Sequence, residues 1–438
     1  MPELKRALSR LDLTMIAIGS TIGSGIFLTP SLIARTLPSP LLICTVWIVG
    51  GLMAMAGALT FAELGGMMPR AGGVYVYLSE AYGGLFGFLY GWAYFLVVNT
   101  GGIAALSIAF ATYFSYLVPL GSMGVKAAAI VGLLIVTVIN VLGVRAGGIF
   151  SDVFTFLKLA GIAGIIVVGL GWGSPGIMNF SFTTSDFPDG LSGAMAIAMV
   201  GVLWSYGGWQ HASFTAAEAK DPRRAVPFAM VLGSVVVVVV YLLTNLAYMF
   251  LLTPQAMGSS AHIAADAVSV ILGSLGGTIV AVAIFISTFG TAGIYTLTAP
   301  RIYYAMSADG VFFKKVGEIH PVFRTPIFAI LVQSVWAILL ILFWGTFENL
   351  IAYVVFTDWI FFALAAAAIF VFRRRWPHVE RSYRTPGYPF TPIFFIAIAL
   401  WFIVNTLVQE PRQAWAGLLF LALGVPVYYF WRRKNSTL

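Results

Sequence analysis

Apolar stretches of about 20 residues recur along most of this 438-residue chain, and they constrain its fold more than any other feature. A helix of that length crosses the hydrocarbon core of a bilayer. Charged residues make up only 9% of the chain, against about 25% in soluble domains. The sequence therefore predicts an all-α integral membrane protein with about twelve transmembrane helices. We place them near 13–35, 41–67, 84–112, 125–143, 152–172, 191–215, 227–252, 267–306, 327–344, 348–372, 389–408 and 413–431.

The basic residues indicate how the chain is oriented. If the N-terminus is cytoplasmic, nearly all Lys and Arg residues fall on the cytoplasmic side, and only Arg35, Lys126 and Arg412 fall outside. This distribution follows the positive-inside rule. We therefore expect a multi-pass protein of the plasma membrane with both termini in the cytoplasm. The formal net charge of +8 is then a signal of topology, and no nucleic-acid partner is expected.

Residues 18–27 lie inside the first apolar stretch but weaken a helix. Glycine costs roughly 1 kcal/mol relative to alanine in a helix interior, and the segment is rich in small residues: Gly19, Ser20, Gly23, Ser24 and Gly25. Lipid offers no partner for freed N–H and C=O groups, so such a break is tolerated only where it lines a cavity. The segment is therefore a candidate binding site, although small residues also occur at ordinary contacts between membrane helices.

A second weak segment occurs five stretches later, at residues 204–211, where Gly207 and Gly208 are flanked by polar groups. Matching interruptions in two halves of a chain are typical of transporters built from inverted repeats. An odd spacing inverts the second copy, so we expect the two breaks to face each other at the bilayer midplane. Free N–H groups at one helix end suit a carboxylate, and free carbonyls at the other suit an ammonium group. The pair would bind a zwitterionic amino acid.

Four segments together resemble the L-amino acid transporter family of the amino acid–polyamine–organocation superfamily, in its bacterial form. They are residues 23–27, 206–209, 218–227 and 301–310, and the resemblance spans roughly residues 8–330. It implies a LeuT-type fold with two inverted repeats of five helices and broken helices 1 and 6, followed by two further helices. The corresponding boundaries are 1–172, 191–372 and 389–438.

The resemblance also implies the residues of a substrate site. The carboxylate would lie at the backbone amides and hydroxyl of the turn at Ser24, Gly25 and Ile26. The ammonium would lie at carbonyls of the two broken helices, and Trp204 would form a lid over the substrate. The expected substrate-binding residues are Ile22, Ser24, Gly25, Ile26, Trp204, Ser205, Tyr206 and Gly207. His211 is either a contact to the substrate side chain or a histidine at a helix interface.

Lys158 lies inside the fifth apolar stretch, where a charge costs about 3 kcal/mol and usually has a function. Sodium-coupled relatives place a sodium ion near this position, and Ser287 and Thr288 resemble the hydroxyls that bind it. We expect the ammonium of Lys158 to donate hydrogen bonds to helix-1 carbonyls in place of the ion. The alternative is a lysine whose amine reaches the membrane surface.

The sequence thus predicts a sodium-independent exchanger of small to medium neutral L-amino acids. No acidic residue is expected beside either break, since Glu63 and Asp358 belong to other helices and Glu218 follows helix 6. The alternatives are a proton- or sodium-coupled symporter and an antiporter of cationic amino acids or polyamines.

Other functional classes lack support in the sequence. Sequence patterns typical of hydrolases, redox enzymes and nucleotide-binding proteins do not occur, and we expect neither catalysis, a cofactor nor a metal site. The single cysteine, Cys44, lies in the second apolar stretch. Eukaryotic family members join a partner glycoprotein through a cysteine between helices 3 and 4. That loop, at about 118–126, has none, so no disulfide-linked heavy chain is expected.

Overall fold

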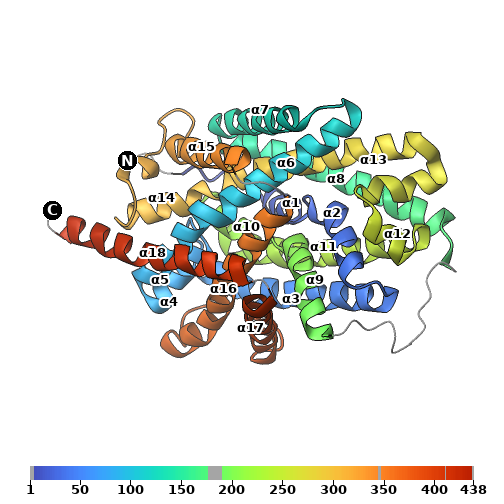
Figure 1. The fold of residues 1–438 in the computed structure, drawn as a ribbon. Coiled ribbons are helices and arrows are strands. Elements are labelled where there is room, and N and C mark those ends of the chain that lie inside the picture. The colour runs from blue at the N-terminus through green and yellow to red at the C-terminus, as the bar shows by residue number, and fades with distance from the viewer. Residues whose placement is uncertain (1–3, 176–189, 344–346, 410, 437–438) are drawn as a thin grey trace.

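The computed structural model describes residues 4–175, 190–343, 347–409 and 411–436, and these residues are almost entirely helical (Figure 1). The first half of the chain contains α1 (Arg10–Thr21), α2 (Gly25–Thr36), α3 (Pro40–Met67), α4 (Val74–Tyr82), α5 (Gly84–Ala93), α6 (Asn99–Leu117), α7 (Ser122–Val141) and α8 (Val144–Trp172). A π-helical turn, Tyr94–Val98, joins α5 to α6.

The second half begins with the short pair α9 and α10 and ends with two long helices. Its elements are α9 (Leu191–Tyr206), α10 (His211–Phe214), α11 (Pro222–Leu251), α12 (Pro254–Ser259), α13 (Ile263–Thr298), α14 (Pro300–Ala308), α15 (Ile327–Phe343), α16 (Phe347–Arg375), α17 (Phe390–Gln409) and α18 (Pro411–Ser436). Figure 1 shows α1, α2, α9 and α10 near the middle of the molecule, with longer helices around them.

The predicted membrane fold is confirmed. Among the described residues, ten helical spans are long and apolar enough to cross a bilayer, and two shorter apolar helices, α9 and α15, complete the predicted set of twelve. Helices 1 and 6 of that set are both interrupted, as expected. The helix α4 was not predicted, because its nine residues are too few for a membrane span. The division into repeats at 1–172 and 191–372 stays a prediction.

The outer helices carry apolar side chains on the face that points away from the protein. On α7 these are Val131, Leu134, Ile135 and Val138, each about half exposed or more. Water would penalise such a surface, whereas lipid does not, so the pattern fits a helix that borders the bilayer. The helices of the breaks are different, since α1 and α2 are mostly buried.

A buried ion pair holds the segments around the second break together. Glu218 follows α10, and its two carboxylate oxygens accept hydrogen bonds from Nε of Arg301 at 2.7 Å and from Nη2 at 2.9 Å. Both side chains are completely buried. The backbone carbonyl of Glu218 also accepts from the N–H groups of Ala7 and Leu8, at 2.9 Å each. The pair therefore connects the residues before α1, the residues after α10 and the helix α14.

Removing one partner of this pair should destabilise the protein strongly. Arg301→Met leaves the Glu218 carboxylate buried without its cation, and we expect unfolding in detergent to become easier by about 3–5 kcal/mol. The control is Arg70→Met, which breaks the exposed pair of Arg70 with Glu80 and should cost less than about 1 kcal/mol. Equal losses of unfolding free energy in the two variants would contradict this prediction.

Candidate functional site

The two helix breaks lie directly against each other. Residues 22–24 separate α1 from α2, and residues 207–210 separate α9 from α10. The hydroxyl of Ser20 donates to the carbonyl oxygen of Gly208 at 2.8 Å. Gly208 has a φ of 135°, and a Cβ at this position would lie 2.6 Å from the backbone carbon of Ser20. Only glycine allows both this conformation and this approach.

The start of α2 packs with equal closeness on the end of α9. A Cβ at Gly25 would lie 2.6 Å from Cα of Ser205, so the two backbones could not approach as they do with any larger residue. The hydroxyl of Ser205 donates to the carbonyl of Gly201 at 2.7 Å and lies 2.9 Å from Oγ1 of Thr29. The side chain of Ser205 therefore holds α9 against α2, and only its backbone faces the break.

The breaks leave backbone groups of opposite polarity without partners. Among the described residues, no acceptor is found for the N–H groups of Ser24, Gly25 and Ile26, and no donor for the carbonyls of Ser205 and Tyr206. The first group lies at the positive end of α2 and the second at the negative end of α9. The indole Nε1 of Trp204 donates to Oγ of Ser24 at 3.2 Å and so spans the two ends. This arrangement can bind one carboxylate and one ammonium group.

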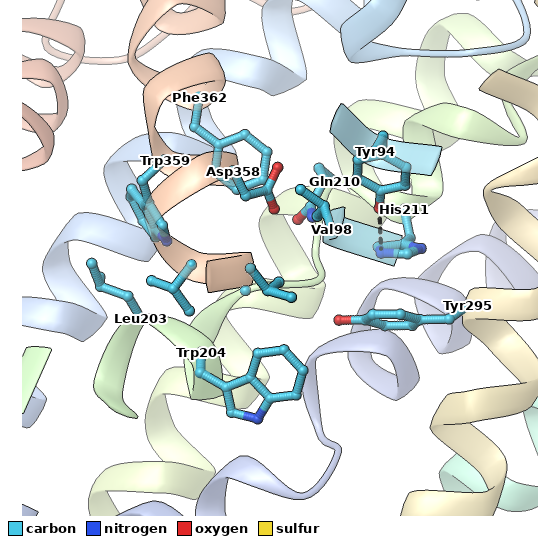
Figure 2. A pocket seen from close by; sticks show the side chains of 13 residues that line it. Tyr94, Val98, Leu203, Trp204, Gln210, His211, Tyr295, Asp358, Trp359 and Phe362 are labelled. Carbon is cyan, nitrogen blue, oxygen red and sulfur yellow. Dashed lines mark hydrogen bonds between the residues drawn. The ribbon is translucent and has the colours of Figure 1, made fainter. Parts of the chain in front are cut away.

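A small cavity opens between the second break and three other helices (Figure 2). The residues that line it come from the π-helical turn, the end of α9, the second break, the start of α10, α13 and α16. They are Tyr94, Val98, Leu203, Trp204, Gly207, Gln210, His211, Tyr295, Val354, Val355, Asp358, Trp359 and Phe362. The cavity has a volume of about 20 Å³ for the centre of a water-sized sphere, which is room for about one water. A substrate must therefore enlarge it.

The π-helical turn positions part of this lining. The wider turn places Tyr94 and Val98 at the cavity, and such turns are frequent at functional sites. The Tyr94 hydroxyl lies 3.1 Å from Nε2 of His211, whose Nδ1 lies 2.5 Å from Oγ1 of Thr298. The His211 ring also stacks on Tyr295, with centroids 4.3 Å apart. Both nitrogens of His211 thus contact protein groups, which favours the helix-interface interpretation.

Lys158 is buried, with 1% exposure, and its ammonium points at the end of α1. It donates to the carbonyls of Gly19 at 2.9 Å and Ile22 at 2.7 Å, and to Oγ1 of Thr291 at 2.6 Å. These three bonds use all three N–H groups of an ammonium. The amine therefore does not extend to the membrane surface.

Two of the predicted site residues make other contacts than expected. The hydroxyl of Thr288 bonds to carbonyls of its own helix, at Ile284 and Phe285, and no hydrogen bond to Lys158 is found among the described residues. Thr291 takes the expected place, and sequence reasoning missed it although it follows Ser287 by one helical turn. The carbonyl of Ile22 accepts from Lys158 and Thr291, so it is not open to a substrate ammonium as predicted.

The other predicted residues lie where the breaks meet. Ser287 directs its hydroxyl at the carbonyl of Gly23, at 3.3 Å. Tyr206 contributes only its backbone, because its ring packs among Trp47 and Tyr241, with centroids 5.6 and 5.2 Å away. Gly207 and Trp204 both line the cavity.

The expectation that no acidic residue lies beside a break was wrong. Asp358 on α16 lines the cavity together with Gly207 and Trp204. Sequence reasoning noted only that Asp358 belongs to another helix. The helices α16 and α9 are in contact although they lie far apart in the sequence. Its occurrence inside an apolar stretch was the available signal, since ionisable residues in membrane helices usually have a function.

Comparison with known proteins agrees with this geometry. Residues 8–429 match the amino acid permease family. The chain belongs to the amino acid permease family. It is 32% identical to the serine/threonine exchanger SteT of Bacillus subtilis, across 99% of this chain and 98% of that protein. It is 29% identical to the human cystine/glutamate transporter, across 99% and 87%, and 31% identical to the mouse b(0,+)-type amino acid transporter 1, across 98% and 88%. The predicted family is confirmed.

The contact between the breaks gives a direct test of the site. Gly208→Ala should abolish transport, because its Cβ would lie 2.6 Å from backbone atoms of Ser20 and Thr21, which cannot turn aside as the end of a flexible side chain can. Gly164→Ala on α8 is the control, since no atom lies within 4 Å of its Cβ position. Amino acid uptake into proteoliposomes is the measurement. Normal uptake by Gly208→Ala would show that the breaks do not need this contact.

Proposed function

We propose that this permease exchanges small to medium neutral L-amino acids across the plasma membrane without sodium. The observation that carries the proposal is the pair of opposed helix ends. Among the described residues, no partner is found for the N–H groups at residues 24–26 or for the carbonyls of Ser205 and Tyr206. A zwitterion satisfies both ends at once. Both termini would be cytoplasmic, in accordance with the distribution of basic residues.

Substrate would bind between α2 and α9 and would be released by alternate opening of the two sides. The carboxylate would occupy the N–H groups of Ser24, Gly25 and Ile26. The ammonium would occupy the carbonyls at the end of α9, because those of Gly19 and Ile22 already accept from Lys158. Trp204 bridges the two ends and would act as the lid that must swing aside.

Lys158 supports independence from sodium. Its ammonium carries the positive charge that a bound cation would supply and donates to helix-1 carbonyls. The names of the relatives also support exchange, since the Bacillus subtilis protein is a serine/threonine exchanger. The chain has one cysteine, Cys44, inside α3, so we further propose that it works without a disulfide-linked heavy chain.

A second candidate function is exchange of cationic amino acids, and Asp358 is the observation that favours it. A carboxylate in the cavity can neutralise a positive side chain. The backbone groups of the two breaks would bind the carboxylate and ammonium of neutral and of cationic amino acids alike.

Exchange in proteoliposomes should be the same in sodium and in choline buffer, and Lys158→Gln should reduce it at least tenfold. The amide has fewer donors than the ammonium and no charge, so the carbonyls of Gly19 and Ile22 lose a charged donor and keep only the hydroxyl of Thr291 nearby. Lys126→Gln is the matched control, because Lys126 donates to the carbonyl of Leu342, away from the breaks. Loss of transport in choline buffer would contradict sodium independence. Net uptake without amino acid inside the vesicles would contradict exchange.

A further inference from the structure

We propose that Asp358 determines which side chain the permease accepts. Its carboxylate would accept a hydrogen bond from a donor on a short substrate side chain, either a hydroxyl or an ammonium group. This inference rests on the proposed function, in which the helix breaks bind the part common to all amino acids. It adds the residue that would distinguish one amino acid from another.

One oxygen of the Asp358 carboxyl group is buried without a hydrogen-bond partner among the described residues. Asp358 is 9% exposed, and its Oδ1 is buried without a hydrogen bond to any of the described residues. Figure 2 shows the carboxylate directed from α16 toward the interior of the cavity. Buried polar atoms are nearly always hydrogen-bonded, and an unpaired one costs free energy. A ligand with a donor would remove that cost.

The charged and polar side chains around the cavity do not neutralise Asp358. No Lys or Arg is among the residues that line it. The two nitrogens of His211 lie at hydrogen-bond distance from Tyr94 and Thr298, and Oε1 of Gln210 accepts from the N–H of Gly208. The cavity therefore holds one acidic group and no permanent cation, which favours a substrate that brings a donor with it.

The rings around Asp358 limit the length of that side chain. Trp204, Tyr295, Trp359 and Phe362 all line the same cavity, which has a volume of only about 20 Å³ for the centre of a water-sized sphere. The Trp204 ring is also held by its bond to Ser24. A side chain of two to three atoms needs less rearrangement than a long one, so short donors fit best.

Isosteric pairs of amino acids test the proposal on the unmodified protein. Serine and 2-aminobutyrate differ by a hydroxyl in place of a methyl group, as do threonine and valine, and 2,4-diaminobutyrate and norvaline differ by an ammonium. In at least one pair, we expect the amino acid with the hydroxyl or ammonium group to be exchanged in proteoliposomes about tenfold faster or more than its apolar isostere. A site that forms a hydrogen bond to a polar group rejects the analogue without that group. No preference in any pair would overturn the inference, while exchange of the apolar members would leave the proposed function intact.

Two variants of Asp358 identify the donor. Asp358→Ala should abolish the preference within each pair. Asp358→Asn retains an acceptor without the charge, so it should keep a hydroxyl preference in part and lose an ammonium preference. Asp266→Asn is the matched control, because Asp266 is exposed and bonds to Ser260 on the surface. A ratio in Asp358→Ala equal to that of the unmodified protein would contradict the proposal.

A binding measurement separates failure of this inference from failure of the proposed function. If the unmodified protein exchanges none of these amino acids, the proposed function is wrong. Thermal unfolding of the purified protein in detergent then reports binding alone. Stabilisation by serine or 2,4-diaminobutyrate beyond that by its isostere would support the role of Asp358, and equal or absent stabilisation would overturn it.

Discussion

Backbone N–H and C=O groups at bilayer depth need partners, because lipid supplies none, and the two interrupted helices release several of them. Side chains of the protein pair some of these groups. Lys158 takes the carbonyls of Gly19 and Ile22, and the hydroxyl of Tyr241 takes that of Thr21 at 2.9 Å. Among the described residues, no partner is found for the N–H groups where α2 begins or for the carbonyls where α9 ends. The candidate site thus consists of backbone groups that a ligand, rather than the protein, would pair.

The hydrogen bonds of Lys158 also connect three helices. Because its amine is covalently part of α8, its bonds join the end of α1 to α8, and Thr291 extends the same cluster to α13. A lysine remains in place whatever the ionic composition on either side of the membrane. The end of α1 is therefore held by groups of the protein itself.

The sequence predicts the spans and the breaks well because both follow from local physics: the length of apolar stretches and the helix-weakening effect of glycine. It fails where three-dimensional neighbours decide. Thr291 lies on the same helix face as Ser287, four residues before it, whereas Thr288 points in another direction. A resemblance between motifs does not show which of two neighbouring hydroxyls faces the site. The π-helical turn at Tyr94–Val98 and the approach of α16 to α9 leave no local pattern, so the position of Asp358 was missed.

The division of the site between two sets of elements has a consequence for specificity. In the proposed site, backbone atoms of α2 and α9 would face the part that all amino acids share. Substitution of Gly25 or Gly208 would force the backbones of the two breaks apart. Side chains of the π-helical turn, α13 and α16 line the rest of the cavity. A change at Asp358 therefore leaves the contact between the breaks intact. Because neither glycine needs to change when the cavity side chains do, one scaffold of paired breaks can serve amino acids with different side chains.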